Sequence, residues 1–410
     1  MTPNKITTDV AVIGGGAAGL IAAAEAAKRG RRTLLIEKNQ RTGRKLLITG
    51  KGRCNVTNNC SAEELMRSVP VNGKFLYSAF SLFSSEDTIN LFESLGVPLK
   101  TERGGRVFPL SDKAMDIADA LLNNAKKSGV KFLFSPAKNI EKKEDLFCIT
   151  TDEAEISAQS VIIATGGKSY PLTGSTGDGY IFAEKFSHTI VPPRAALIPL
   201  ITKEKDAAEM QGLSLKNVSL KLIREDKKKP LYEDIGEMLF THFGISGPMV
   251  LTASCYIEDG AKYKVSIDLK PGLSIEKLDA RLLRDFSENS NKSLRNILPL
   301  LLPSKMIPVI LKRACLSGEI RANSISSEER KKLIEVIKNL TFEIEDSRPI
   351  EEAIITRGGI SVREIDPKTM QSKITEGLFF AGEVIDVNAF TGGYNLQIAF
   401  STGFKAGQNA

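Results

Sequence analysis

The fold of this 410-residue chain is decided by the stretch Val10-Ala11-Val12-Ile13-Gly14-Gly15-Gly16-Ala17-Ala18-Gly19. Its first four residues predict a strand that is apolar on both faces, as in the buried centre of a parallel sheet. The glycines follow in the order Gly14-x-Gly16-x-x-Gly19, and an Ala-rich helical run comes next. The first glycine permits a tight turn, the second lets a pyrophosphate approach the backbone, and the third lets helix and strand pack closely.

An acidic residue at the end of the next predicted strand completes this pattern. Gly30 is placed to end the helix, Thr33-Leu34-Leu35-Ile36 forms the strand, and Glu37 stands at its tip. A carboxylate there accepts hydrogen bonds from both hydroxyls of an adenosine ribose and repels a 2′-phosphate. A glycine motif alone also fits an ordinary turn. The strand before it, the helix after it and the acid beyond it together indicate a dinucleotide site.

The composition is that of a globular protein. Hydrophobic residues make up 42% and charged residues 26% of the chain, and no run reaches the roughly 18 apolar residues that a membrane span requires. The N-terminus lacks the apolar region of a secretory signal. The five cysteines are an odd number, scattered without a Cys-x-x-Cys pair, which argues against a disulfide framework or a zinc site. We therefore expect a cytoplasmic protein with no metal site and no membrane association.

The net charge of +7 raises the question of a nucleic-acid partner. The positive residues are spread along the chain, and the densest run, Lys227-Lys228-Lys229-Pro230, predicts a hairpin turn. No basic patch interleaved with aromatic residues stands out. An anionic cofactor accounts for the charge equally well. The sequence therefore argues against a nucleic-acid partner and favours a small-molecule substrate.

The pattern of predicted elements divides the chain into a dinucleotide-binding domain in two parts and an insertion. Residues 1–190 form the first part, in which a second buried strand, Val161-Ile162-Ile163, runs towards glycine. Residues 191–349 form the insertion, with short alternating strands to about residue 270 and helices after that. The buried-strand pattern resumes in residues 350–410, the second part of the domain.

The C-terminal part again combines a strand, an acid and a helix N-terminus. A strand over 377–381 runs into Gly382 and Glu383, and the segment from Thr391 to Gln397 enters a helix that extends to Gly407. This is the layout of an FAD site, in which the acid binds ribityl hydroxyls and the helix dipole stabilises negative charge on a reduced flavin. The alternative for Glu383 is a solvated carboxylate.

These stretches together resemble the bacterial flavoproteins of the aminoacetone oxidase type, a family that also contains bile-acid dehydro-intermediate reductases. The resemblance implies an α/β fold class with a Rossmann-like FAD-binding domain of the glutathione-reductase type. It also implies that the insertion contains a small β-barrel and a helical part. Besides the N-terminal glycine motif, the segments that carry it are residues 49–58, 104–109, 166–180, 241–248 and 382–395.

The resemblance further implies which residues contact FAD. The loop Arg53-Cys54-Asn55 is expected to reach the isoalloxazine ring. All the expected contacts are Gly14, Gly15, Gly16, Ala17, Ala18, Gly19, Glu37, Lys38, Arg44, Lys45, Asn55, Ala137, Ala164, Thr165, Gly166, Gly382, Glu383, Asn395, Leu396 and Gln397.

The sequence does not name a catalytic base. His242 lies in a predicted turn bounded by Gly and Pro, and it is either a proton donor on the substrate side or a turn histidine bonded to backbone. His188 is expected to be structural, and Tyr170 and Lys51 are weaker catalytic candidates. Cys54 has no Cys-x-x-Cys partner, so we expect a packed cysteine rather than a redox thiol.

The function that fits these patterns is FAD-dependent hydride transfer between a small organic substrate and the flavin. The chain holds one complete Gly-x-Gly-x-x-Gly unit, so no dedicated nicotinamide domain is expected, although NAD(P)H can still enter beside the flavin. An oxidase or dehydrogenase and an NAD(P)H-dependent reductase stay open, as does the oligomeric state. The alternative of another class is a flavin-dependent RNA-modifying or RNA-binding protein, because some tRNA-modification enzymes share this flavin domain. A flavin-binding module without turnover is a third alternative.

Overall fold

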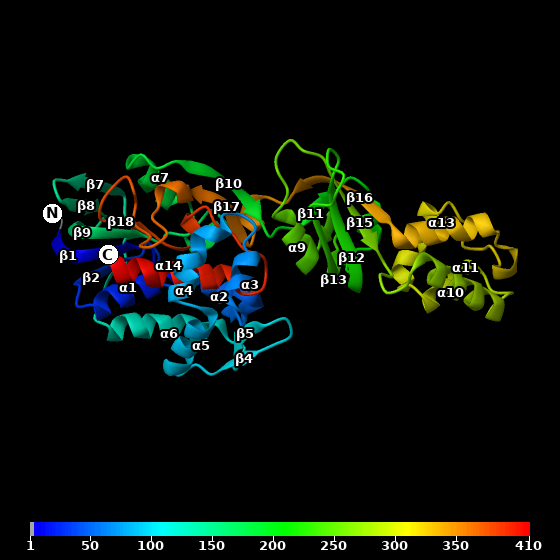
Figure 1. The fold of residues 1–410 in the computed structure, drawn as a ribbon, viewed down its shortest axis with the longest axis horizontal. Helices are drawn as coiled ribbons and strands as arrows, with labels where there is room; N and C mark the ends of the chain where they lie inside the picture. The colour runs from blue at the N-terminus through cyan, green and yellow to red at the C-terminus, as the bar shows by residue number, and fades with distance from the viewer. Residues whose placement is uncertain (1–3) are drawn as a thin grey trace. The chain divides into compact units, whose positions relative to one another are not determined.

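The computed structural model describes residues 4–410, and the chain divides into two compact units (Figure 1). Unit 1 runs to Ala196 and resumes at Ile350, and unit 2 spans Leu197–Pro349. The sequence therefore placed the start of the insertion, residue 191, too early. The prolines at 192 and 193 lie in strand β10 (Ile190–Ala196), at an irregularity of its pairing where a missing N–H is tolerated.

A seven-stranded sheet forms the centre of unit 1. In spatial order its strands are β6 (Lys131–Leu133), β2 (Thr33–Ile36), β1 (Asn4–Ile13), β9 (Ala154–Ile163), β8 (Leu146–Thr150) and β7 (Asn139–Lys143), with β18 (Leu378–Phe380) also pairing with β9. β6, β2, β1, β9 and β18 are parallel, whereas β8 and β7 pair antiparallel. Residues 10–13 of β1 are buried on both faces, as predicted for a central parallel strand.

Two helices from distant parts of the sequence pack on each other in unit 1 (Figure 1). They are α1 (Ala17–Lys28), which follows β1, and α14 (Tyr394–Asn409), which follows β18. A Cβ added at Gly403 would lie 2.4 Å from the carbonyl oxygen of Ala18, and one at Gly407 would lie 2.4 Å from that of Ala22. The two glycines therefore allow the helix backbones to touch.

Shorter elements complete unit 1. A three-stranded sheet has the order β3 (Thr57–Asn58), β5 (Arg106–Pro109), β4 (Leu99–Thr101), and β10 pairs with β17 (Ile355–Ile360). The remaining helices are α2 (Arg44–Ile48), α3 (Ala62–Arg67), α4 (Tyr77–Leu82), α5 (Ser85–Ser94), α6 (Ala114–Lys127) and α7 (Asp178–Lys185).

Two local features of unit 1 depend on backbone geometry. Strand β17 runs through Arg357-Gly358-Gly359, where both glycines have positive φ and a Cβ would meet backbone. Helix α6 has Lys113 at its N-cap position, and Ser111 bonds the Asp116 carboxylate.

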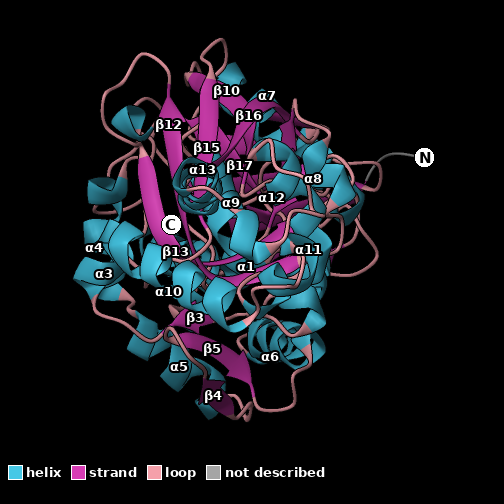
Figure 2. Cartoon of the chain, turned by 90° about the vertical axis from the view of Figure 1, so that its right-hand side faces the viewer, coloured by secondary structure: helices cyan, strands magenta, loops and turns pink. Residues whose placement is uncertain are grey.

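Unit 2 contains a closed six-stranded barrel and a group of helices. The barrel order is β11 (Leu200–Thr202), β14 (Gly244–Ser246), β13 (Tyr232–Phe240), β12 (Ser214–Arg224), β15 (Tyr263–Asp268) and β16 (Leu340–Ser347). Figure 2 shows β13, β12 and β15 as neighbouring strands. The helices are α8 (Asp206–Glu209), α9 (Pro248–Ser254), α10 (Ile275–Glu288), α11 (Leu294–Ile297), α12 (Ile307–Arg313) and α13 (Ser327–Lys338).

Each unit has its own hydrophobic core. In unit 1 the core lies between the parallel sheet and helices such as α1, α6 and α14. In unit 2 the inward side chains of the barrel join apolar side chains of α10, α12 and α13. The predicted fold class, a Rossmann-like α/β domain together with a small barrel and helices, is confirmed.

Candidate functional site

The turn from β1 into α1 forms an open cradle bordered by backbone. Gly14 has φ of 102°, and a Cβ there would lie 2.5 Å from the carbonyl oxygen of Ala164. A Cβ at Gly19 would lie 1.9 Å from the carbonyl oxygen of Gly14, so this position must be glycine. Gly16, the N-cap of α1, borders open space and has no capping side chain. The free N–H groups of the first turn of α1 are thus available to an anion.

Glu37 lies beside this cradle at the end of β2. Its Oε2 accepts a hydrogen bond from the Gly15 N–H at 2.7 Å, and its Oε1 accepts from the Asn39 N–H and side-chain amide at 2.8 and 2.7 Å. The residue is 7% exposed. These donors fix the carboxylate at the place where the sequence predicts the adenosine ribose. The carboxylate oxygens of Glu37 can still accept hydrogen bonds from hydroxyl groups.

The two predicted basic contacts next to Glu37 have partners within the protein. Lys38 Nζ lies 2.7 Å from Asp178 Oδ2, at the start of α7. Arg44 donates to the Asn39 side-chain oxygen at 2.7 Å. Both cations therefore border the cradle while holding neighbouring loops.

Glu383 is the centre of a second polar group, built from four segments of unit 1. Its Oε2 accepts from Lys45 Nζ at 2.7 Å, and its Oε1 accepts from the Thr356 N–H at 2.8 Å and from the Ser169 hydroxyl at 3.0 Å. Lys45 also donates to Ser169 at 2.6 Å. Gly382, with φ of 77°, lies against α1, since its Cβ would be 2.8 Å from that of Ala18. The solvated alternative for Glu383 is wrong, because this carboxylate is held by the protein.

The other predicted contacts lie in loops at the carboxyl ends of the strands or close to them. Ala164, Thr165 and Gly166 follow β9, and Ala137 lies half-buried between β6 and β7. The buried hydroxyls of Thr165, after β9, and of Ser135, after β6, have no hydrogen-bond partner among residues 4–410. Such unpaired groups are what a bound polar ligand would satisfy.

The start of α14 offers backbone rather than side chains. Asn395 closes the preceding loop, donating to the carbonyls of Ala389 and Phe390 and accepting from the Ala389 N–H. Gln397 is fully buried, and its amide is saturated by partners that include Thr57 and Thr88. What remains for a ligand is the set of N–H groups in the first turn, among them those of Asn395 and Leu396.

The loop Arg53-Cys54-Asn55 presents one unpaired side-chain atom. Arg53 pairs with Glu102 and stacks over Phe108 at 4.1 Å, so its guanidinium is engaged away from a ligand. Cys54 is fully buried, and burial raises the pKa of its thiol to about 12, which fits a packed cysteine rather than a redox thiol. The buried Oδ1 of Asn55 has no partner within the described chain.

The site as a whole fits FAD. The open cradle at Gly16, the held carboxylates of Glu37 and Glu383, and the free N–H groups of α14 match the phosphate, ribose, ribityl and pyrimidine parts of that cofactor.

One further residue was missed by sequence reasoning. Asn388, in the loop before α14, is 1% exposed, and neither polar atom of its amide has a partner among residues 4–410. An amide in a C-terminal loop carries no sequence signal that separates it from ordinary turn residues.

The catalytic candidates lie in different parts of the molecule. His242 is exposed on the turn between β13 and β14 of unit 2, with its ring 4.9 Å from that of Phe243. His188 is buried in unit 1, where Nε2 lies 2.8 Å from the Ser372 hydroxyl and Nδ1 lies 3.3 Å from Glu364, in keeping with a structural role. Burial lowers the pKa of His188. Lys51 is exposed.

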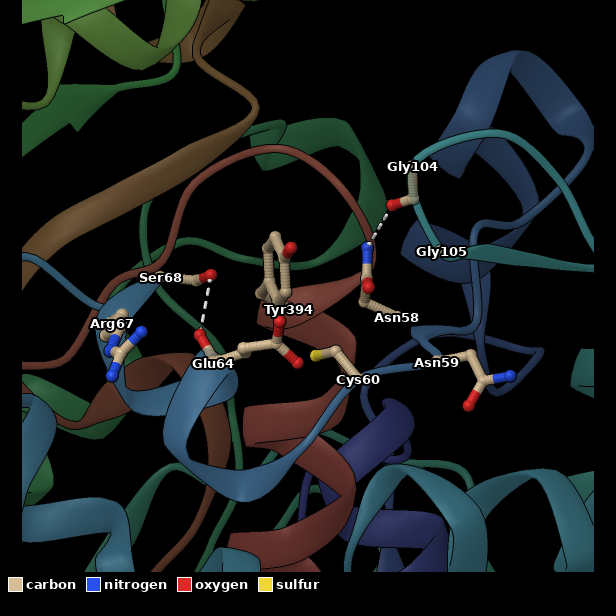
Figure 3. Close-up of a pocket in the computed structure, with 9 residues that line it drawn as sticks. All are labelled: Asn58, Asn59, Cys60, Glu64, Arg67, Ser68, Gly104, Gly105 and Tyr394. Carbon is tan, nitrogen blue, oxygen red and sulfur yellow. Dashed lines mark hydrogen bonds between the residues drawn. The ribbon is translucent and has the colours of Figure 1, made fainter.

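A polar cavity of about 390 Å³ opens at the start of α14 (Figure 3). No aliphatic side chain lines it. Sequence reasoning missed its wall, because α3, the turn between β4 and β5, and α14 are brought together only by the fold. The lining residues are Asn58, Asn59, Cys60, Glu64, Arg67, Ser68, Gly104, Gly105 and Tyr394.

Within residues 4–410, no group of three or more His, Cys, Asp or Glu side chains is arranged to hold a metal ion. None of the helices in this described range combines the length and apolarity needed to cross a membrane.

Comparison with known proteins gives matches over nearly the whole chain. Residues 8–409 match the family model described as HI0933-like protein Rossmann domain. The chain is 31% identical over 411 residues to 3-dehydro-bile acid delta(4,6)-reductase of Clostridium scindens, with 98% of each chain covered. It is 33% identical over 405 residues to ribosomal RNA dihydrouridine synthase of Haemophilus influenzae, with 96% of each covered.

Among solved structures, the chain is similar to 3-ketosteroid-delta4-(5alpha)-dehydrogenase of Rhodococcus jostii, with a TM-score of 0.52 and 13% identity. The match covers 99% of this chain and 98% of that one. At this identity the similarity concerns the fold.

Proposed function

The chain belongs to the HI0933-like family of FAD-binding Rossmann proteins and is an FAD-dependent oxidoreductase, and from this premise we propose that it is a reductase of carbon–carbon double bonds conjugated to a carbonyl group. One observation carries the proposal: relatives with two different substrates match nearly the full chain, and both of their names denote this reaction. A delta(4,6)-reductase of a 3-oxo steroid and a synthase of dihydrouridine each saturate a ring bond near a carbonyl.

The contacts of unit 1 support FAD as the cofactor of this reaction. Bound FAD would supply the two electrons as a hydride. The cradle at Gly16 would hold its pyrophosphate, Glu37 its adenosine ribose, and Glu383, with Lys45, its ribityl chain. The N–H groups at the start of α14 would bind the pyrimidine edge, where the positive end of the helix dipole favours the charge of the reduced ring.

A reductase also needs an external electron donor, and we propose a nicotinamide nucleotide. The chain has one complete Gly-x-Gly-x-x-Gly unit, which the FAD uses in this proposal. The nucleotide would then act from beside the flavin, without a domain of its own.

The leading substrate class is a small organic molecule with a conjugated carbonyl. A second candidate is a uridine in RNA, and the polar cavity at α14 favours it, since nothing in its wall resembles the apolar lining that a steroid skeleton prefers. The net charge of +7 is compatible with RNA but is spread over the chain.

The test is an anaerobic reoxidation experiment on the FAD-loaded protein. The flavin is reduced with dithionite and mixed either with a 3-oxo-4,6-diene bile acid or with a uridine-containing rRNA fragment. We expect one probe to restore the oxidised flavin spectrum and to gain two hydrogens by mass spectrometry, while the saturated form of the same probe does neither. Failure of the protein to retain FAD, or of both probes to reoxidise it, would contradict the proposal.

A separate addition of NADH or NADPH to the oxidised protein tests the electron donor. Bleaching of the flavin band by either nucleotide supports the reductase. A band that stays oxidised would point instead to an oxidase or dehydrogenase reduced by its own substrate.

A further inference from the structure

The cavity at α14 contains a cluster of polar side chains from two elements (Figure 3). Cys60 lies two residues before α3, Glu64 lies within it and Ser68 directly follows it, whereas Tyr394 is the first residue of α14. The volume of about 390 Å³ is within the range of small-molecule sites, roughly 300–1,000 Å³. The cavity therefore has the size of a ligand site and the chemistry of a proton-transfer site.

Tyr394 has the most defined position in this cluster. Its ring packs on Gly392, where a Cβ would lie 2.8 Å from the ring atom Cε2. Ser68, in the same cavity wall, donates its hydroxyl to the carbonyl of Glu64 at 2.9 Å. The ring is thus held at the end of α14 that is proposed to bind the reactive part of the flavin.

The neighbours of Tyr394 differ in their ability to give up a proton. The Glu64 carboxylate accepts hydrogen bonds from Ser61, which lower its pKa, so it is ionised at neutral pH. Burial raises the pKa of Tyr394, and it raises the pKa of the Cys60 thiol to about 11. Arg67, at the rim, is a permanent cation. Two uncharged acids in the cavity therefore keep their proton at neutral pH, the phenol and the thiol.

We propose that Tyr394 is the proton donor of the reduction and that this cavity holds the reacting bond of the substrate. The inference rests on the proposed function. In the step, bound FAD in its reduced form would supply a hydride, two electrons and a proton, to the carbon β to the carbonyl. The π electrons move towards the carbonyl, and the α-carbon takes a proton from the phenol oxygen of Tyr394. The phenolate regains its proton from solvent, and the proposed nicotinamide nucleotide would supply the two electrons for the next turnover.

The test compares the FAD-loaded wild type with Tyr394→Phe and Tyr77→Phe. Tyr77 is 61% exposed on α4, so its variant controls for the substitution itself. Each protein is reduced with dithionite and mixed with the probe that reoxidises the wild type. We expect Tyr394→Phe to slow reoxidation by about 10²–10⁴-fold, the usual contribution of a positioned acid, with unchanged FAD retention and unchanged reduction by dithionite. In the wild type the step should also be slower in D₂O, and this isotope effect should change in Tyr394→Phe.

Three outcomes would overturn the inference. Reoxidation of Tyr394→Phe within about twofold of wild type removes Tyr394 as the donor. A Cys60→Ala variant that loses the step while Tyr394→Phe keeps it would assign the proton to the thiol. A wild type that neither probe reoxidises contradicts the proposed function itself, and the role of Tyr394 with it, whereas the first two outcomes leave the function standing.

Discussion

Lys45 Nζ lies 2.7 Å from Glu383 Oε2, and this ion pair joins two segments of unit 1 between which the whole of unit 2 is inserted in the sequence. Both side chains are partly buried, with 24% and 20% of their surfaces exposed. Ser169 contacts both partners and closes the group. The ion pair therefore fixes the place where the two parts of the proposed flavin site meet.

Replacing Glu383 by Gln should weaken FAD binding. The variant removes the charge that Lys45 and the proposed ribityl hydroxyls share, and charge-assisted hydrogen bonds contribute about 1.5–3 kcal/mol. We expect an increase in the Kd for FAD of roughly 10- to 150-fold, measured by titrating the apoprotein. Asp9→Asn, which breaks the Arg32–Asp9 pair in the middle of β1, is the control and should bind FAD normally. Equal losses in both variants would contradict a local role for Glu383.

Two glycines of the first turn should respond to alanine in opposite ways. At Gly16 an added Cβ meets no atom within 4 Å, so Gly16→Ala should fold with wild-type stability but obstruct the pyrophosphate and lose FAD. At Gly19 the Cβ would lie 1.9 Å from a backbone oxygen, so Gly19→Ala should lower the unfolding temperature of the apoprotein. Thermal unfolding without cofactor and flavin content after purification separate the two effects. A Gly16→Ala protein that retains FAD would contradict the placement of the pyrophosphate.

Gln397 should prove to be a stability residue rather than a cofactor side chain. Gln397→Leu removes the oxygen that accepts from the buried hydroxyls of Thr57 and Thr88, together with the amide group that donates to the carbonyl of Phe83. Each buried group left unsatisfied costs about 1–3 kcal/mol. We expect a lower unfolding temperature and an unchanged flavin spectrum in the protein that remains folded. Gln159→Leu, at an exposed position, is the matched control. An altered flavin spectrum with normal stability would show instead that the side chain reaches the cofactor.

His188 should make the stability of unit 1 depend on pH. Burial lowers its pKa from 6.5, so the unfolded chain binds the proton more readily than the folded protein. Its contribution is complete above pH 6.5 and is lost as the pH falls through the lowered pKa. Ser372, Glu364 and Phe380 surround the ring, and the Glu364 carboxylate opposes this shift. The unfolding midpoint should be lower at a pH below 6.5 than at a pH above it. In His188→Gln the midpoint should change less between the two pH values. If the unfolding midpoint of the variant changes with pH as steeply as that of the wild type, His188 is not the cause of the pH dependence.

The sequence predicted the parts of the site that local geometry determines. Gly14, Gly16 and Gly19 are recognisable because a turn between strand and helix imposes their spacing, and Glu37 because the next parallel strand must end beside that turn. The same local logic misplaced the start of unit 2. Pro192 is unfavourable in a regular strand, and only the irregular pairing of β10 makes it acceptable.

The walls of the cavity could not be predicted in this way. Ser61 and Glu64 form a capping box, which indicates the start of a helix but not what the helix faces. That Tyr394 lies beside this helix depends on pairings between residues more than 300 positions apart, such as the one of Val71 with Asn388. The sequence also does not show whether a side-chain amide has hydrogen-bond partners. It could not distinguish Gln397, whose amide is fully bonded, from Asn388, whose amide has no partner in the described chain.

The contact of α1 with α14 has a consequence for the order of events during protein synthesis. The ribosome makes α1 early, whereas β18, Glu383 and α14 emerge only after all of unit 2. Until then the small-residue face of α1 and the last residues of β9 lack their partners, so the nascent first segment presents apolar surface suited to a chaperone. Unit 2, which has its own core, can fold in this interval. We therefore expect FAD to bind after unit 2 has been made, because the residues proposed to close the flavin site follow unit 2 in the sequence.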